Sequence, residues 1–380
     1  MTLIFARLLL LPCAFWAAQA TTLAGSATSL EEHLSAGNEL LRAGRYQEAE
    51  KTFWGALKAP ELSDTQRLRL VANLNSVALA HGSAGRYSEA EALYRRVLTL
   101  WDKKQLSPDK YEATILSSLA KLYQSQRKFG QALPLLRRAL RIWQSLVGQD
   151  DPEIALVMGN LAGLLYLMRR YSEAENFYRT ALATQENALG RRHPDIARTL
   201  NNLATVCQAT AHYGEAEDLY RDAQNIQETA LGSQHPDVGK TLNNLATLQA
   251  QQGKYHPAEQ LYQRAIEVLE SADHPAVGMA LANLAQLYVT QGRYSDAEPL
   301  NLRALAVWEK SLGLEHPRLV ASLLNQALIL RKLKRKAEAA PFQTRAVAIK
   351  SKYGAEISHT IDVSVLQPIR DRSKRFQASP

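Results

Sequence analysis

Four histidines, each directly before a proline, are the residues whose type and spacing most resemble a site of chemistry. They are His193, His235, His274 and His316, and they stand 39 or 42 residues apart. Neutral imidazole binds zinc, but each ring nitrogen must lie about 2 Å from the metal. If every interval holds a pair of helices, consecutive histidines are roughly 16–20 Å apart. We therefore predict no metal site, and turn residues before a helix whose first position accepts proline.

Sequence motifs for catalysis are absent from the chain. It has no glycine-rich phosphate loop, no His-Glu-x-x-His, no Gly-x-Ser-x-Gly and no cysteine pair after residue 20. Cys207 lies on an apolar helix stripe, which favours a small buried hydrophobe over a reactive thiol. We predict that the protein is not an enzyme and needs no cofactor, with a hydrolase of unrecognised site as an alternative.

The elements that would position any functional side chain follow from a repeat. An aromatic residue returns at intervals of 39 to 42 residues: Tyr46, Tyr87, Phe129, Tyr171, Tyr213, Tyr255 and Tyr294, with Lys336 in the same register. Small residues, nearly all alanine, stand nine residues before, three residues after and ten residues after these positions. Such self-similarity indicates an array of stacked units.

Each unit is predicted to be two helices joined by a short turn. Apolar residues recur at helical spacing in two successive stripes: Leu200, Leu203, Ala204 and Cys207, then Ala216, Leu219, Tyr220 and Ala223. Between such stripes stand glycines suited to a left-handed helix end: Gly44, Gly85, Gly253 and Gly292. We further predict capping boxes at Ser88, Ser172 and Ser295 that begin the second helix. The predicted fold is all-α, a solenoid of eight helix–turn–helix repeats over residues 29–354.

The pattern Leu-x-x-Leu-Ala, then Tyr-x-x-Ala-Glu, then Tyr-x-x-Ala resembles the tetratricopeptide repeat. The 42-residue period, the junction over residues 231–237 (LGSQHPD) and the segments 200–204 and 242–246 (LNNLA) resemble its kinesin-light-chain variety. The resemblance implies a right-handed α-solenoid whose first helices line a concave surface. The sequence departs from the pattern near its end, at Asn301, Gln326 and Lys336.

A column of small polar residues lies eleven positions before the aromatic residue: Ser35, Ser76, Ser118, Asn160, Asn202, Asn244, Asn283 and Asn325. This column is about half a turn away from the apolar stripe, so packing does not require it. In the tetratricopeptide family the position faces the concave groove. The resemblance therefore implies a peptide-binding groove formed by the five asparagines, because a carboxamide both donates and accepts hydrogen bonds. Arg198 and Lys240, one turn earlier, would attract acidic side chains or a carboxylate. The alternative is that the asparagines satisfy carbonyls between helices and bind nothing.

The first twenty residues are predicted to be a cleaved export signal. A basic start over residues 1–7 precedes an apolar run over residues 8–17 and the small residues Ala18 and Ala20. The apolar run is too short to span roughly 30 Å of hydrocarbon as a helix. We expect cleavage after Ala20 and a periplasmic or extracellular protein, with an uncleaved membrane anchor as the alternative. Residues 21–28 are predicted to be a linker.

The positive charge is concentrated at the C-terminal end. The whole chain has a net charge of +8, and residues 331–380 hold 12 Lys or Arg and 4 Asp or Glu. Residues 21–330 are therefore nearly neutral, which argues against nucleic acid as a partner. The basic region is either a solvated end cap or a weak contact for anionic envelope polymers or lipids. Residues 355–380 are predicted to be a basic tail, in which residues 360–366 alternate like a strand.

The leading hypothesis is a non-enzymatic protein–protein interaction scaffold that binds an extended peptide or protein segment in its concave groove. The alternative is a self-associating structural scaffold of the cell envelope with no ligand in the groove. The sequence does not identify the partner.

Overall fold

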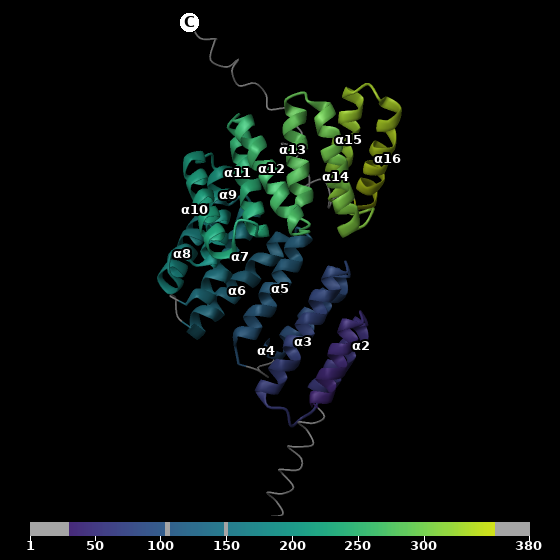
Figure 1. Cartoon of the computed structure of the whole chain (residues 1–380). Coiled ribbons are helices and arrows are strands. Elements are labelled where there is room, and N and C mark those ends of the chain that lie inside the picture. The colour runs from purple at the N-terminus through teal and green to yellow at the C-terminus, as the bar shows by residue number, and fades with distance from the viewer. Residues whose placement is uncertain (1–29, 103–106, 148–150, 354–380) are drawn as a thin grey trace, which may run out of the picture. The chain divides into compact units, whose positions relative to one another are not determined.

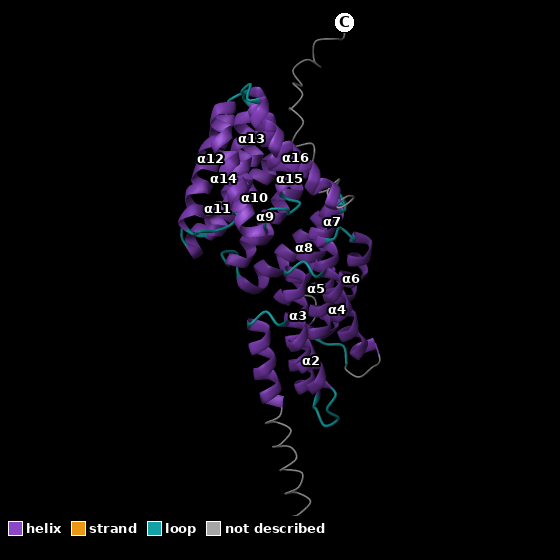
Figure 2. Cartoon of the chain, turned by 90° about the vertical axis from the view of Figure 1, so that its right-hand side faces the viewer, coloured by secondary structure: helices purple, strands orange, loops and turns teal. Residues whose placement is uncertain are grey.

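The structure is a computed structural model that describes residues 30–102, 107–147 and 151–353, and every regular element in these ranges is a helix (Figure 2). The predicted signal, linker and C-terminal tail lie outside the described residues. None of the described helices is both long enough and apolar enough to cross a membrane.

The chain divides into two compact units, residues 1–149 and 150–380. The first contains a helix over residues 30–42, α2 (Tyr46–Leu57), α3 (Asp64–Ser83), α4 (Tyr87–Asp102), α5 (Lys110–Ser125) and α6 (Phe129–Val147). The second contains α7 (Pro152–Leu167), α8 (Tyr171–Leu189), α9 (Pro194–Ala209), α10 (Tyr213–Leu231), α11 (Pro236–Gln251), α12 (Tyr255–Ser271), α13 (Val277–Thr290), α14 (Tyr294–Leu312), α15 (Leu319–Lys332) and α16 (Lys336–Tyr353) (Figure 1). The predicted all-α architecture is confirmed.

Helices pack in the pairs that the repeat predicts. In the second unit α7 packs on α8, α9 on α10, α11 on α12, α13 on α14 and α15 on α16, and each second helix also contacts the first helix of the next pair. The alanines three residues after the aromatic are fully buried in all these pairs but the last, where Ala339 is nearly so. A methyl side chain at this point lets two helix backbones approach closely. In the other column, nine residues before the aromatic, the first repeat has Gly37 in place of alanine, and a Cβ there would collide with the Phe53 ring.

The turns between paired helices use a left-handed residue, as predicted. Gly44, Gly85, Gly253 and Gly292 have φ between 73° and 78°. Four other turns place a residue with a side chain there: Arg127, Arg169, Ala211 and Lys334, with φ between 57° and 65°. These residues adopt a conformation that glycine accepts more readily.

The predicted serine capping boxes are wrong. The second helix α8 begins at Tyr171, and its N-cap is Arg170, whose side chain makes no capping bond. The helical hydrogen bonds already start with the amide of Ala174 and the carbonyl of Arg170, so Ser172 lies within the first turn. Instead, the Arg170 guanidinium binds the Glu173 carboxylate through two bonds of 2.5 and 2.7 Å. Arg293 similarly holds Asp296 at the start of α14.

Within the second unit, the first helices lie on the inner side of the stack. Each first helix contacts the next one, α7 with α9, α9 with α11, α11 with α13 and α13 with α15. In the same described residues no second helix contacts the following second helix. A stack is concave on the side where its elements are closer together. The first helices therefore line its concave surface.

Candidate binding surface

The predicted asparagine column lies on the first helices of the second unit, and its members differ in burial. The side chains of Asn160 in α7 and Asn202 in α9 are exposed, and their carboxamides form no hydrogen bond with any residue of the described ranges. Asn244 in α11 and Asn283 in α13 are half-buried. Asn325 in α15 is buried, and its Oδ1 finds no donor among the described residues. Two carboxamides on the concave side are thus free to bind a ligand.

Asn244 and Asn283 take part in a chain of amides that joins two repeats. The Asn283 Nδ2 donates to Oδ1 of the buried Asn243 at 3.0 Å. Asn243 in turn donates to Asn244 Oδ1 at 3.4 Å. The alternative was that the asparagines bond groups between helices and bind no ligand. Asn283 fits this alternative, although its partner is a side chain and not a backbone carbonyl.

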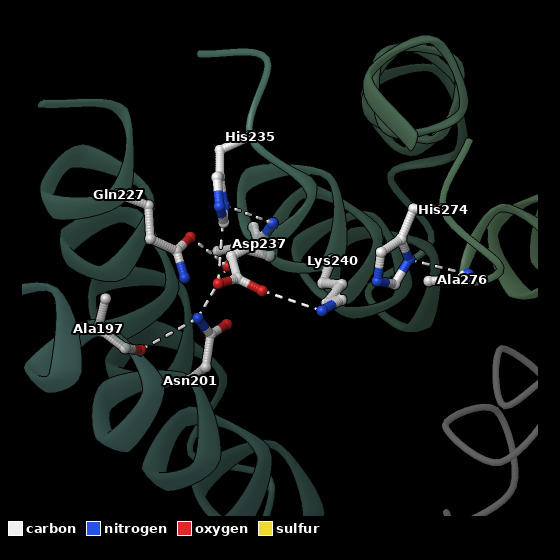
Figure 3. Close-up of polar contacts among 9 residues, drawn as sticks. Ala197, Asn201, Gln227, His235, Asp237, Lys240, His274 and Ala276 are labelled. Carbon is white, nitrogen blue, oxygen red and sulfur yellow. Dashed lines mark hydrogen bonds and ion pairs between the residues drawn. The ribbon is translucent and has the colours of Figure 1, made fainter. Parts of the chain in front are cut away.

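Sequence reasoning missed the residues one position earlier, which join consecutive repeats. Asn201 Nδ2 donates to the Ala197 carbonyl at 3.1 Å and to Thr241 Oγ1 of the next repeat at 2.8 Å (Figure 3). Thr241 donates to Gln227 Oε1 at 2.7 Å, and both of these side chains are buried. The pairs Asn201-Asn202 and Asn243-Asn244 in the sequence carried this signal. The first residue of each pair connects repeats, whereas the second is exposed at Asn202 and half-buried at Asn244.

The predicted cations Arg198 and Lys240 are exposed beside acidic residues of their own helices. Lys240 Nζ lies 2.9 Å from Asp237 Oδ1 (Figure 3), and Arg198 Nη2 lies 3.9 Å from Asp195 Oδ1. Exposed pairs of this kind contribute about 0–1 kcal/mol. A carboxylate of a ligand can therefore replace the helix's own acid at little cost.

Two exposed apolar side chains continue this row of cations, and sequence reasoning missed them. Leu156 in α7 and Met279 in α13 occupy the register of Arg198 and Lys240 and are 45% and 49% exposed. Across four consecutive first helices the row reads apolar, cationic, cationic and apolar. Single exposed apolar residues are common on protein surfaces. Here both lie on the concave side, where a ligand can cover them.

The four histidines precede helices, as predicted: His193 and His235 cap α9 and α11, and His274 and His316 cap the turns that lead into α13 and α15. Each ring Nδ1 accepts a hydrogen bond from the backbone amide two residues later, at 3.1 to 3.2 Å. Pro194 and Pro236 occupy the first helical positions of α9 and α11. Helices α13 and α15 begin two residues after the corresponding prolines, because a short turn precedes them. Nowhere in residues 30–102, 107–147 or 151–353 do three metal-binding side chains gather around a common point.

Cys207 is a small buried residue, as predicted. It is fully buried on α9. Burial, with smaller contributions from Glu215 and Glu175, raises the pKa of its thiol to about 11. The thiol therefore stays protonated and unreactive at neutral pH.

Known proteins share the repeated helix pairs of this fold. Residues 67–271 match the tetratricopeptide repeat in four overlapping segments, and residues 276–352 match it in a fifth. The sequence has no significant match among curated proteins. Among solved structures, BtubC (BKLC) from P. vanneervenii is 23% identical, with 64% of this chain and 92% of that one covered and a TM-score of 0.50. A putative kinesin light chain from P. anserina is 21% identical, with 56% and 99% covered and a TM-score of 0.49.

A Rap protein complexed with Competence and Sporulation Factor is 16% identical, with 88% of this chain and 99% of that one covered and a TM-score of 0.54. At this identity the likeness concerns the fold alone. The match to the tetratricopeptide repeat, in contrast, is a match of sequence. It covers most of the chain and includes the helix pairs described above. The chain belongs to the tetratricopeptide-repeat family.

Proposed function

We propose that the protein is a non-enzymatic scaffold whose second unit binds an extended segment of a partner protein or peptide on its concave surface. The observation that carries the proposal is the pair Asn160 and Asn202, two exposed carboxamides without partners on consecutive first helices. A carboxamide matches the donor and acceptor of a peptide group. The fold is also that of a Rap protein solved with Competence and Sporulation Factor.

The surrounding side chains suggest which segment would fit. Consecutive first helices contact one another directly, so on this side they lie about 8–10 Å apart and not the roughly 16–20 Å expected from two helix widths per repeat. An extended chain advances about 3.3 Å per residue. One step from helix to helix therefore corresponds to about three residues of ligand. Arg198 and Lys240 favour acidic residues in the middle of the segment, and Leu156 and Met279 favour apolar residues near its ends. We propose that the partner is met outside the cytoplasm, because residues 1–20 have the pattern of an export signal.

The test compares two double variants in a selection of peptides from a phage-displayed random library. Asn160→Ala with Asn202→Ala removes the free carboxamides from the concave side. The matched control is Asn176→Ala with Asn225→Ala, which removes exposed carboxamides from the second helices α8 and α10. Because none of these four side chains bonds another described residue, both variants are expected to fold, as circular dichroism would verify.

We expect peptides selected on the parent protein to bind the control equally well and the concave-side variant at least about tenfold more weakly, the loss of one to two hydrogen bonds. Arg198→Glu with Lys240→Glu should weaken the same peptides and favour versions in which lysine replaces their acidic residues. Equal binding by all variants would move the binding site away from the concave surface and refute the proposal.

A further inference from the structure

The residue twenty positions before the aromatic bonds the backbone where the first helix starts in six consecutive repeats, but its chemistry changes along the chain. It caps α5, α7, α9 and α11 directly, and in the last two repeats it caps the short turn that leads into α13 or α15. In α5 the Asp109 carboxylate accepts from the amides of Tyr111 and Glu112, both at 2.9 Å. In α7 the Asp151 carboxylate accepts from the amide of Glu153 at 2.8 Å. The next four repeats use the histidine rings described above. One capping function is thus performed by two groups that bind protons at different pH.

A histidine can accept this bond only while its Nδ1 carries no proton. Protonation turns Nδ1 into a donor that faces another donor, the backbone amide. It also places a positive charge at the positive end of the helix dipole. A carboxylate cap keeps its charge well below pH 5, whereas histidine changes its charge between about pH 5 and 8.

The four histidines differ in whether a second acceptor is present. Asp195 Oδ2 lies 3.6 Å from the Nδ1 of His193, and Asp237 Oδ2 lies 3.7 Å from that of His235. A carboxylate oxygen therefore stands beside the ring nitrogen at these two positions. In the other two repeats the residue in the place of the aspartate is Ala276 or Arg318.

Burial, followed by a neighbouring cation, opposes protonation of the last two histidines. His274 faces Lys240, Asp237 and His235, and burial, followed by Lys240, lowers its pKa from 6.5. Burial and then Arg318 likewise lower the pKa of His316. The neighbouring Glu315 is bound to Lys352 of α16. The hydrogen bonds that His274 and His316 accept therefore hold at neutral pH. They are lost as the pH falls through the lowered pKa values of the two rings.

We infer that acid selectively uncaps the turns that lead into α13 and α15, while Asp151 continues to cap α7 and an aspartate stands beside the capping rings of α9 and α11. The consequence for binding rests on the proposed function: a ligand that spans the concave surface loses its support from α13 and α15 in acid. The uncapping itself does not depend on any ligand.

Hydrogen exchange of the full chain, read by mass spectrometry at about pH 7.5 and pH 5.0, measures the uncapping directly. Peptides from the starts of α9, α11, α13 and α15 are each compared with the start of α7 in the same sample, which removes the intrinsic effect of pH on exchange. A helix cap changes the opening equilibrium of a helix start about fivefold. We expect a relative loss of protection of this size at α13 and α15, and a clearly smaller loss at α9 and α11.

Two sets of variants separate uncapping from a general acid effect. His274→Asn with His316→Asn retains a capping acceptor that does not titrate, and should abolish the loss of protection at α13 and α15. Ala276→Asp gives His274 the carboxylate that His235 has, and should reduce the loss at α13 alone. His256→Asn, on the exposed side of α12, is the control and should leave the loss unchanged. Equal loss at all four starts, or a loss that persists after His274→Asn and His316→Asn, would overturn the inference.

If exchange shows the selective loss but no peptide binds the concave surface, the caps respond to acid and the proposed function fails alone. If peptides bind equally at both pH values while the caps are lost, only the link between uncapping and binding is refuted.

Discussion

The side-chain amide of Asn301 in α14 donates to Oε1 of Gln326 in α15 at 2.8 Å, and both side chains are buried from solvent. The first three repeats of the second unit have tyrosine in the place of Asn301, and the first four have leucine in the place of Gln326. Asn301 also donates to the carbonyl of Ser322 at 3.0 Å. Two departures from the repeat pattern, 25 residues apart, are therefore hydrogen-bonded to one another, although the Oδ1 of Asn301 has no partner among the described residues.

Gln326→Leu alone should lower the free energy of unfolding by about 1–3 kcal/mol, because the buried Asn301 amide loses a partner. Asn301→Leu alone should have a similar cost. The double variant should recover most of the loss, since an apolar pair leaves neither amide unsatisfied. Urea denaturation of the four proteins gives the coupling energy. Strictly additive losses would mean that the two residues are not a stabilising pair.

Replacing Ala211 by glycine should stabilise the second unit by roughly 0.5–1 kcal/mol. Ala211 has φ 64°, where an L-residue pays for contacts of its Cβ and glycine does not. The opposite change, Gly253→Ala, should cost a similar amount, and it introduces no steric conflict, because no atom lies within 4 Å of the added methyl. Thermal unfolding of both variants measures the effect. A gain from Gly253→Ala would contradict this account of the turn.

His81 should make the first unit sensitive to acid. The ring is completely buried in α3, and neither nitrogen has a partner in the described part of the chain. Burial, and then Arg86, lower its pKa from 6.5. Below about pH 6.5 the unfolded chain binds a proton that the folded chain does not, so stability falls as the pH drops through the lowered value. His81→Leu should remove this part of the pH dependence, read as amide exchange in α3 between pH 7.5 and 5. An unchanged pH dependence would exclude His81 as its source.

Cys207 should react with a thiol reagent at about pH 8 at least about a hundredfold more slowly in the native protein than in urea. Its thiol has a pKa of about 11 and no exposure to solvent. The measurement uses a Cys13→Ser background, so that one thiol is observed. A cysteine introduced at the exposed Asn225 is the control and should react rapidly in the folded state. Rapid native labelling of Cys207 would show that α9 opens readily.

The sequence was sufficient to predict the helix pairs, because close helix packing selects small residues at fixed positions. The alanine columns and the turn glycines report on backbone geometry, which is the same in every repeat. The start of the second helix was placed wrongly at Ser172. The pattern Ser-Glu-Ala-Glu fits a capping box, but the left-handed residue Arg169, three positions before Ser172, fixes where the helix begins.

The site was only partly predictable, since its polar contacts join residues about forty positions apart. Position within the repeat correctly placed the asparagine column on the first helices. It did not distinguish the exposed Asn202 from Asn283, which bonds Asn243 of the preceding repeat. Nor did it reveal that Asn301 and Gln326 compensate each other. Periodicity describes what repeats have in common, whereas these contacts depend on what makes each one different.

The contacts between consecutive repeats imply that the units are not interchangeable modules. Asn201 needs the hydroxyl of Thr241, and the equivalent residue in the following repeat is Ala280. Asn243 needs Asn283, and Asn301 needs Gln326. Excising or duplicating one unit would preserve the backbone stack but bring mismatched amides and hydroxyls face to face. The order of the units is therefore specified by neighbour-to-neighbour pairing, and shuffling them would be opposed even where each sequence still folds as a hairpin.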